Sequence, residues 1–290
     1  MTYELDKSQY DGSVFVWSDP CLNDTDGDGL WDSEDPLVLK YGICNKMSYD
    51  YKEELYKEID AQIKEDFSWV MQNKNIGYYT TKECLDIIYE YDDLITQLSN
   101  TYMIPKAIIQ SVLLRELRCV DILDGLVDSA VINYFAYKYE LDNYNNSTTQ
   151  QYLTEPPTMP VFSKKDSSTG LGQIFAETAI KANNWAVDKK IIDNDIFDYN
   201  NWKDREIIWT RLKDDNKYNI TMISIVLMWG MQEDDCLMQT MDRSFWKFSD
   251  EQIKAMLTRY NGIGDEAVNY GNETFKCYQI FNSYNKLDLK

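Results

Sequence analysis

The feature that most constrains this chain is an apolar stripe at helical spacing that contains a carboxylate. Within residues 104–118, Ile109, Val112 and Leu113 lie seven, four and three positions before Glu116, so all four side chains share one face of a helix. Burying an unpaired carboxylate costs several kcal/mol or raises its pKa until it takes up a proton. A raised pKa is what a general acid needs near neutral pH. Glu116 is therefore the candidate catalytic residue, with a structural ion pair as the alternative.

Most of the remaining sequence is typical of helices, and the predicted fold class is mainly α. The capping-box pair Ser249 and Gln252 starts one helix, and Thr80 or Thr81 can cap another. Residues 143–149 are rich in Asn, Ser and Thr and are predicted to form a loop. Few strand signals occur. Helices are expected at about 49–74, 80–95, 122–140, 175–187, 204–213, 219–234 and 249–260.

Composition excludes several classes of function. There is no histidine among 290 residues, which excludes Ser-His-Asp and Cys-His nucleophilic systems and zinc sites with histidine ligands. With 29 basic and 49 acidic residues the net charge is −20, so phosphate backbones repel the chain and no nucleic-acid partner is expected. Six dispersed cysteines form no CxxC pair. No apolar stretch approaches the roughly 20 residues of a membrane span.

An acidic loop at residues 24–35 matches a calcium-binding loop position by position. The loop begins with alternating carboxylates, and Gly29 lies where the loop turns sharply. At its last position Asp35 stands in place of the usual Glu. Carboxylates this close repel one another, so a hard cation is the natural partner; a solvated acidic turn is the alternative. The loop resembles thrombospondin type 3 repeats, which implies a structural Ca²⁺ and a secreted or cell-surface location. The expected ligands are Asp24, Asp26, Asp28, Leu30, Asp32 and Asp35.

Two further motifs follow the Glu116 helix. Residues 170–174 read Gly-Leu-Gly-Gln-Ile just before a predicted helix, and residues 260–262 read Tyr-Asn-Gly at a helix end. Glycines permit close backbone approach to a ligand, and the Gln173 amide can both donate and accept hydrogen bonds. Tyr260 can place a hydroxyl in a cleft or simply pack. Either motif can equally be a packing turn.

Together with Asn219-Ile220 and Thr178-Ala179, these motifs resemble the lysozyme-like lytic transglycosylases, which include the related goose-type lysozymes. The resemblance covers about residues 101–282 and follows the order of the motifs in that family. It implies a lysozyme-like helical domain with Glu116 as its catalytic residue. The implied substrate-binding residues are Gly170, Gln173, Tyr260 and Asn261. The expected organisation is a small irregular calcium-binding segment at 1–45, a helical linker or extension at 46–100, and a lytic domain at 101–290 with an insertion at about 120–165.

The resemblance also implies a reaction. Glu116 would protonate the glycosidic oxygen between N-acetylmuramic acid and N-acetylglucosamine in peptidoglycan. It would then act as base while the muramoyl 6-hydroxyl closes a 1,6-anhydro ring. A goose-type muramidase would instead use a second carboxylate to activate water, with Asp166 the first candidate and Asp121 and Asp128 weaker ones. Phe175 stands where goose-type enzymes can carry an Asp, which favours the transglycosylase.

Two interpretations beyond the enzyme itself stay open. A net charge of −20 disfavours adsorption to anionic walls, so a non-catalytic wall-binding or adhesin module is an alternative. The N-terminus also lacks the basic and apolar regions of a signal peptide. Either export takes another route or these residues end a longer secreted protein, such as a toxin, whose partners would include an immunity protein or other domains of the parent chain.

Overall fold

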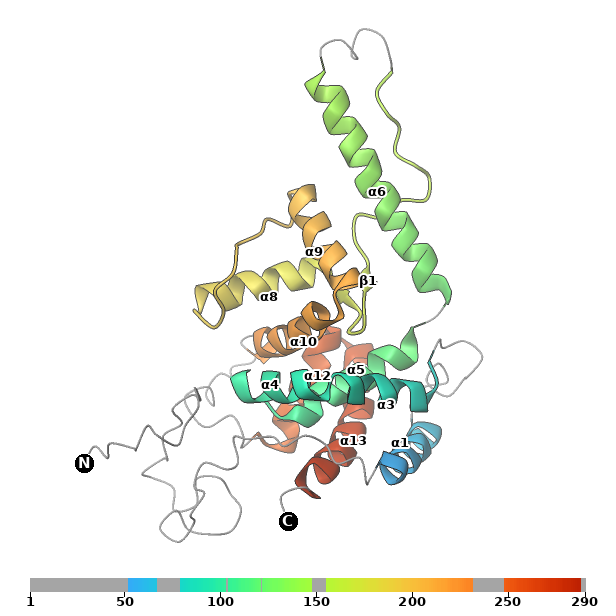
Figure 1. Cartoon of the computed structure of the whole chain (residues 1–290), viewed down its shortest axis with the longest axis vertical. Helices are drawn as coiled ribbons and strands as arrows, with labels where there is room; N and C mark the ends of the chain where they lie inside the picture. The colour runs from blue at the N-terminus through green and yellow to red at the C-terminus, as the bar shows by residue number, and fades with distance from the viewer. Residues whose placement is uncertain are drawn as a thin grey trace, which may run out of the picture.

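The described residues of the computed structural model are mostly helical (Figure 1). The description covers residues 52–66, 79–102, 104–120, 122–147, 155–231 and 248–287. These residues form ten α-helices and one two-stranded antiparallel hairpin, which confirms the mainly α prediction. None of the helices described is long and apolar enough to cross a membrane.

The helices lie on both sides of the hairpin along the chain. Before the hairpin come α1 (Lys52–Asp66), α3 (Thr81–Glu90), α4 (Asp92–Tyr102), α5 (Lys106–Cys119) and α6 (Ile122–Asn146). The hairpin pairs β1 (Ser168–Thr169) with β2 (Ile174–Phe175). After it come α8 (Ala176–Asp188), α9 (Trp202–Asp214), α10 (Asn216–Met231), α12 (Asp250–Asn261) and α13 (Asp265–Leu287).

The centre of the fold is α5, which packs against α3, α4, α10 and α13. The apolar stripe predicted for it is fully buried, since Ile109, Val112 and Leu113 have no exposed surface. At the start of α5, the buried Lys106 ammonium pairs with the Asp92 carboxylate at 2.8 Å. This ion pair ties α4 to α5 where both side chains are removed from water.

Two predicted helix starts are confirmed by side-chain caps. The Thr80 hydroxyl accepts from the Glu83 N–H while the Glu83 carboxylate accepts from the Thr80 N–H. Ser249 and Gln252 form the same reciprocal pair at α12. Each capping box satisfies two N–H groups that have no partner within the helix.

The segment predicted as an insertion forms an arm that projects from the other helices (Figure 1). It consists of α6 and the return at 155–165, where the Lys164 N–H donates to the Ala130 carbonyl at 3.1 Å. The loop prediction for residues 143–149 is wrong at its start, because α6 continues to Asn146. The Trp202 indole donates to Asp142 at 3.3 Å, and this contact with α9 anchors the last turns of α6 against the weak helix propensity of Asn.

The last two helices form a close antiparallel pair. Gly262 and Gly264, at φ of 121° and 91°, connect α12 to α13 in a backbone region that favours glycine. A Cβ at Gly271 would lie 2.1 Å from the Thr258 hydroxyl, so the two backbones approach too closely for a larger residue. This packing brings Tyr270 beside Tyr260, with ring centroids 6.4 Å apart.

Candidate functional site

A cleft of about 470 Å³ opens where the end of α5, the β1–β2 hairpin, α8, α10 and the end of α12 meet. Sequence-predicted residues from three separate motifs lie on its walls: Glu116, Gln173, Tyr260 and Asn261. The other lining residues are Cys119, Ser168, Ile174, Phe175, Thr178, Val226, Trp229, Gly230, Arg259, Gly262 and Ile263.

Glu116 is held by an aromatic side chain from α13. The Tyr270 hydroxyl donates to Glu116 Oε1 at 2.6 Å. The Tyr270 ring is itself fixed, because it stacks on Tyr260 and the Arg115 guanidinium lies 5.3 Å from its centroid. Arg115 in turn pairs with Glu273 at 3.2 Å. One carboxylate oxygen is therefore oriented by a rigid donor on the wall of the cleft.

Burial raises the pKa of Glu116 to about 7. The hydrogen bond from Tyr270 and the positive charge of Arg115 oppose this shift in the pKa, whereas the negative charge of Asp124 adds to it. The pKa of Tyr270 is raised well above its ordinary value, chiefly by burial, so its hydroxyl stays a donor. A carboxyl group with these properties exchanges a proton near neutral pH, as a general acid and base must.

The Gly-Leu-Gly-Gln turn is tied to the start of α10 by Asn219. This fully buried amide accepts from the Gly172 N–H at 2.7 Å and donates to the carbonyls of Thr169 and Leu212 at 3.1 and 2.9 Å. Gly170 does not line the cleft but lies behind the turn, where a Cβ would come within 2.2 Å of the Asn219 amide nitrogen. Its φ of 72° also favours glycine. Two motifs that are 47 residues apart thus form one structural unit.

Gln173 occupies a strained backbone position at the cleft, with φ of 46°. Its amide closes the hairpin turn: Nε2 donates to the Gly170 carbonyl at 3.0 Å, and Oε1 accepts from the Ser168 hydroxyl at 3.1 Å. An amide oxygen and an NH₂ group can each make a further hydrogen bond. Gln173 can therefore hold the turn and contact a ligand at once.

Tyr260 links the two sides of the cleft. Its hydroxyl donates to the Gly172 carbonyl at 2.6 Å, which joins α12 to the glycine turn. Asn261 follows at the last position of α12 and also lines the cleft. The predicted convergence of the Glu116 helix, the glycine turn and the Tyr-Asn-Gly turn is thus found in the structure.

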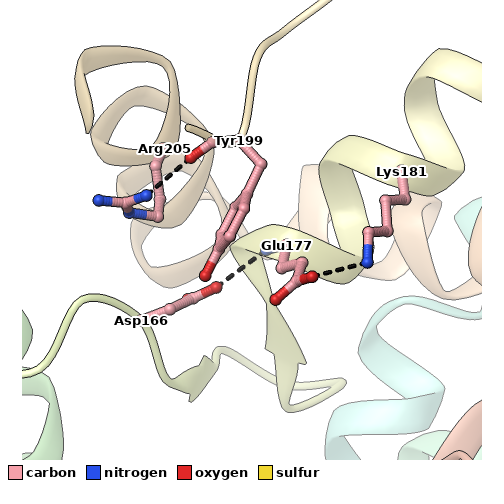
Figure 2. Close-up of polar contacts among 5 residues, drawn as sticks. All are labelled: Asp166, Glu177, Lys181, Tyr199 and Arg205. Atoms are coloured by element: carbon pink, nitrogen blue, oxygen red, sulfur yellow. Dashed lines mark hydrogen bonds and ion pairs between the residues drawn. The ribbon is translucent and has the colours of Figure 1, made fainter. Parts of the chain in front are cut away.

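Asp166 does not line the cleft, because it caps α8 from outside the helix (Figure 2). Its two carboxylate oxygens accept from the Ala176 and Glu177 N–H groups at 3.1 and 2.9 Å. Burial raises the pKa of Asp166, and the hydrogen bonds from these N–H groups oppose that shift. Both oxygens are engaged with the start of the helix, in the manner of an N-cap.

Of the other two candidate second carboxylates, the structure describes only Asp128, and it too lies away from the cleft lining. Asp128 accepts from the Thr169 hydroxyl at 3.3 Å and is not among the lining residues. Asp121 lies outside the described residues. Among the described residues that line the cleft, Glu116 is the single carboxylate.

A substitution at Asp166 separates a capping role from a catalytic one. We expect Asp166→Asn to lower the free energy of unfolding by about 1 kcal/mol, since one of two accepted hydrogen bonds is lost, and to leave the glycan cleavage predicted from the sequence unchanged. Thermal unfolding and release of soluble glycan fragments measure the two effects. Loss of cleavage in a folded variant would contradict the capping role.

Three residues of the site were missed by sequence reasoning: Tyr270, Arg259 and Trp229. Tyr270 lies on α13, a helix absent from the predictions, and the packing of α13 against α12 and α5 places it beside Glu116. Arg259 directly precedes the Tyr-Asn-Gly motif, so its position in the motif could have indicated it. Trp229 is one of eight tryptophans, and nothing local distinguishes it.

The predicted calcium loop lies outside the described residues, as do its six expected ligands: Asp24, Asp26, Asp28, Leu30, Asp32 and Asp35. Within the part of the chain that the structure describes, no group of three or more His, Cys, Asp or Glu residues could hold a metal ion. The three described cysteines, Cys84, Cys119 and Cys277, form no disulfide with one another. Burial raises the pKa of Cys119 to about 11, so the thiol that lines the cleft is neutral at neutral pH.

No protein-family model, no curated protein and no solved structure matches this chain. The mainly helical fold and the cleft geometry are therefore the grounds on which a function can be argued.

Proposed function

We propose that this protein cleaves the β-1,4 bond between N-acetylmuramic acid and N-acetylglucosamine in peptidoglycan, as a lytic transglycosylase. The main support for this proposal is the environment of Glu116. Its side chain is a carboxyl group with a pKa of about 7 on the wall of a cleft whose other described lining residues include no carboxylate. Trp229, Tyr260 and Phe175 offer the aromatic faces on which sugar rings can pack.

Glu116 performs both proton transfers in this reaction. In the first, its protonated carboxyl group donates to the glycosidic oxygen as the bond to the anomeric carbon breaks. In the second, the carboxylate takes the proton of the muramoyl 6-hydroxyl while that oxygen attacks the anomeric carbon. The acid is regenerated and a 1,6-anhydro ring forms without water, so one carboxylate is sufficient.

A hydrolase that uses a second carboxylate is the other candidate, and one observation favours it. The negative charge of Asp124, in the first turn of α6, raises the pKa of Glu116, so this carboxylate lies within electrostatic range of the acid. An inverting hydrolase places its two carboxyl groups about 6.5–9.5 Å apart. Asp124 is outside the cleft lining, and for this reason we favour the transglycosylase.

The direct experiment is to incubate the whole chain with purified peptidoglycan sacculi and to follow both turbidity and soluble fragments. The transglycosylase releases fragments and lowers turbidity. A folded protein that binds sacculi without releasing fragments would support the wall-binding module, and one that does neither would overturn the proposal. If cleavage occurs, peptidoglycan reaches the protein outside the cytoplasm, which agrees with the secreted or cell-surface location expected from the calcium loop.

The pH dependence of cleavage follows from the raised pKa of Glu116. The acid must be protonated when substrate arrives, so the rate is expected to fall as pH rises through about 7. Tyr270 stabilises the ionised form and lowers the pKa, so Tyr270→Phe should move this fall to higher pH. Because Tyr270 acts through Glu116, it is a positioning residue. Initial rates on soluble glycan fragments from about pH 5 to about pH 9 cover the transition.

An unchanged midpoint in Tyr270→Phe would contradict the assignment, because a purely structural tyrosine would lower the rate equally at every pH. Tyr278→Phe is a matched control on the same helix, since Tyr278 stacks on Phe275 rather than contacting Glu116. It should leave the midpoint where it is.

A further inference from the structure

The cleft lining contains few ionisable side chains. Glu116 and Arg259 are the acidic and basic side chains among its described lining residues. Cys119 and Tyr260 are neutral there, since burial raises the pKa of each. Arg259 is therefore the one basic residue among the described residues that line the cleft, in a chain whose net charge is −20.

The position of Arg259 is set by the close approach of two helices. It lies in the last turn of α12, directly before Tyr260 and Asn261. Gly230, near the end of α10, lines the same cleft, and a Cβ there would lie 3.2 Å from the Arg259 Cβ. The missing side chain at Gly230 leaves room for Arg259 on the wall that α10 and α12 share.

An arginine that lines a cleft can bind a planar anion. It binds carboxylates through two parallel hydrogen bonds, and such charge-assisted bonds are about twice as strong as neutral ones. The sugar rings of peptidoglycan carry hydroxyl and N-acetyl groups, which are neutral. The negative charge of the polymer near the scissile bond lies on the lactyl arm of N-acetylmuramic acid, as a free carboxylate or as the carboxylates of the attached peptide stem.

We infer that Arg259 binds a carboxylate on the lactyl arm of N-acetylmuramic acid and thereby sets which sugar occupies the subsite beside Glu116. This inference rests on the proposed function and adds a specificity determinant to it. N-acetylglucosamine has no lactyl arm, so the contact distinguishes the two alternating sugars. It also attracts an anionic glycan locally, although the net charge of the chain repels it at long range.

Binding measurements with inactive protein test the inference. The full chain with Glu116→Gln is compared with the double variant Glu116→Gln/Arg259→Gln, by calorimetric titration with three soluble oligosaccharides of equal length. One contains N-acetylglucosamine alone and is uncharged. The second alternates with N-acetylmuramic acid that has a free lactyl carboxylate, and the third carries peptide stems.

We expect Arg259→Gln to weaken binding of a carboxylate-bearing oligosaccharide by about tenfold, which is about 1.4 kcal/mol, and to leave the uncharged one unchanged. Loss on the second oligosaccharide identifies the lactyl carboxylate as the ligand, and loss on the third alone identifies the stem. Arg259→Lys keeps the charge but not the planar fork, so it should retain part of the affinity.

Lys254→Gln is the matched control, since it removes one positive charge from the same helix outside the cleft lining, where its ammonium lies 4.7 Å from the Phe275 ring centroid. It should leave all three affinities unchanged. Equal weakening on the uncharged oligosaccharide, or no weakening on any, would overturn the inference alone. If the Glu116→Gln protein binds none of the three, the proposed function fails and the inference with it.

Discussion

Glu116→Gln is expected to lower the rate of glycan cleavage by about 10²–10⁴-fold, the usual contribution of a general acid. Gln keeps the shape of the side chain and can still accept the hydrogen bond from Tyr270, but it carries no proton that it can transfer. The measurement is the initial rate of soluble fragment release at a pH near 6, where Glu116, with its pKa of about 7, is mostly protonated.

The same substitution has a second signature in stability. The pKa of Glu116 is about 7 in the folded protein, above the ordinary value of 4.5, so the folded state holds this proton more tightly than the unfolded state does. The wild-type protein therefore loses stability from this group as pH rises through that range, whereas Gln does not titrate. As pH rises from 4.5 to about 7, the melting temperature of the variant should increase relative to that of the wild-type protein. Above this range the difference between the two melting temperatures should stay constant.

Glu177→Gln provides the matched control for both effects. Glu177 forms an exposed pair with Lys181 on α8, and pairs of this kind contribute little to stability. Its substitution should change neither the rate nor the pH dependence of melting. Full cleavage activity in Glu116→Gln would refute the role of Glu116 as the acid.

Asn219→Ala is expected to lower the free energy of unfolding by about 3 kcal/mol, because buried groups that lose their partners cost about 1–3 kcal/mol each. The Gly172 N–H and the Thr169 and Leu212 carbonyls all lose the Asn219 amide. Chemical denaturation measures this change in the free energy of unfolding, provided that the dependence on denaturant concentration has the same slope in both proteins. Cleavage should fall further than the unfolded fraction explains, since the Gly172 carbonyl also anchors the cleft residue Tyr260.

Asn216→Ala is the control on the same helix. Asn216 is exposed and donates to the Tyr91 hydroxyl at 3.1 Å, and surface substitutions of this kind usually stay within about 0.5 kcal/mol. Gly170→Ala should reproduce the effect of Asn219→Ala, because its Cβ would occupy the space of the Asn219 amide. A stable Asn219→Ala protein would show that the turn is held by other contacts.

The helical class and the main elements of the cleft could be predicted because local patterns determine them. Apolar residues at a spacing of 3.6 predict the α5 helix from its own sequence, and capping boxes at Thr80 and Ser249 satisfy their own helix ends. The convergence of Glu116, Gln173 and Tyr260 could be predicted only through the resemblance to a family, since spacing along the chain does not bring them together.

What could not be predicted depends on packing between distant elements. Asp166 was the first candidate for a second carboxylate, but it caps the N-terminus of α8. It reaches that position because the chain returns from the arm beside the start of α8. The Tyr270 contact with Glu116 requires the antiparallel pairing of α12 and α13. The continuation of α6 through residues 143–146 follows a tertiary contact, since the Trp202 indole of α9 donates to Asp142 just before them.

We propose above all that Glu116 is the single catalytic carboxylate and that the muramoyl 6-hydroxyl, rather than water, attacks the anomeric carbon. Mass spectrometry of the fragments released from purified peptidoglycan in heavy-oxygen water tests this most directly. We expect fragments that end in 1,6-anhydro-N-acetylmuramic acid, one water lighter than hydrolysis products and free of the heavy isotope. Reducing ends that carry heavy oxygen would contradict this proposal and would assign the reaction to a hydrolase with a second carboxylate.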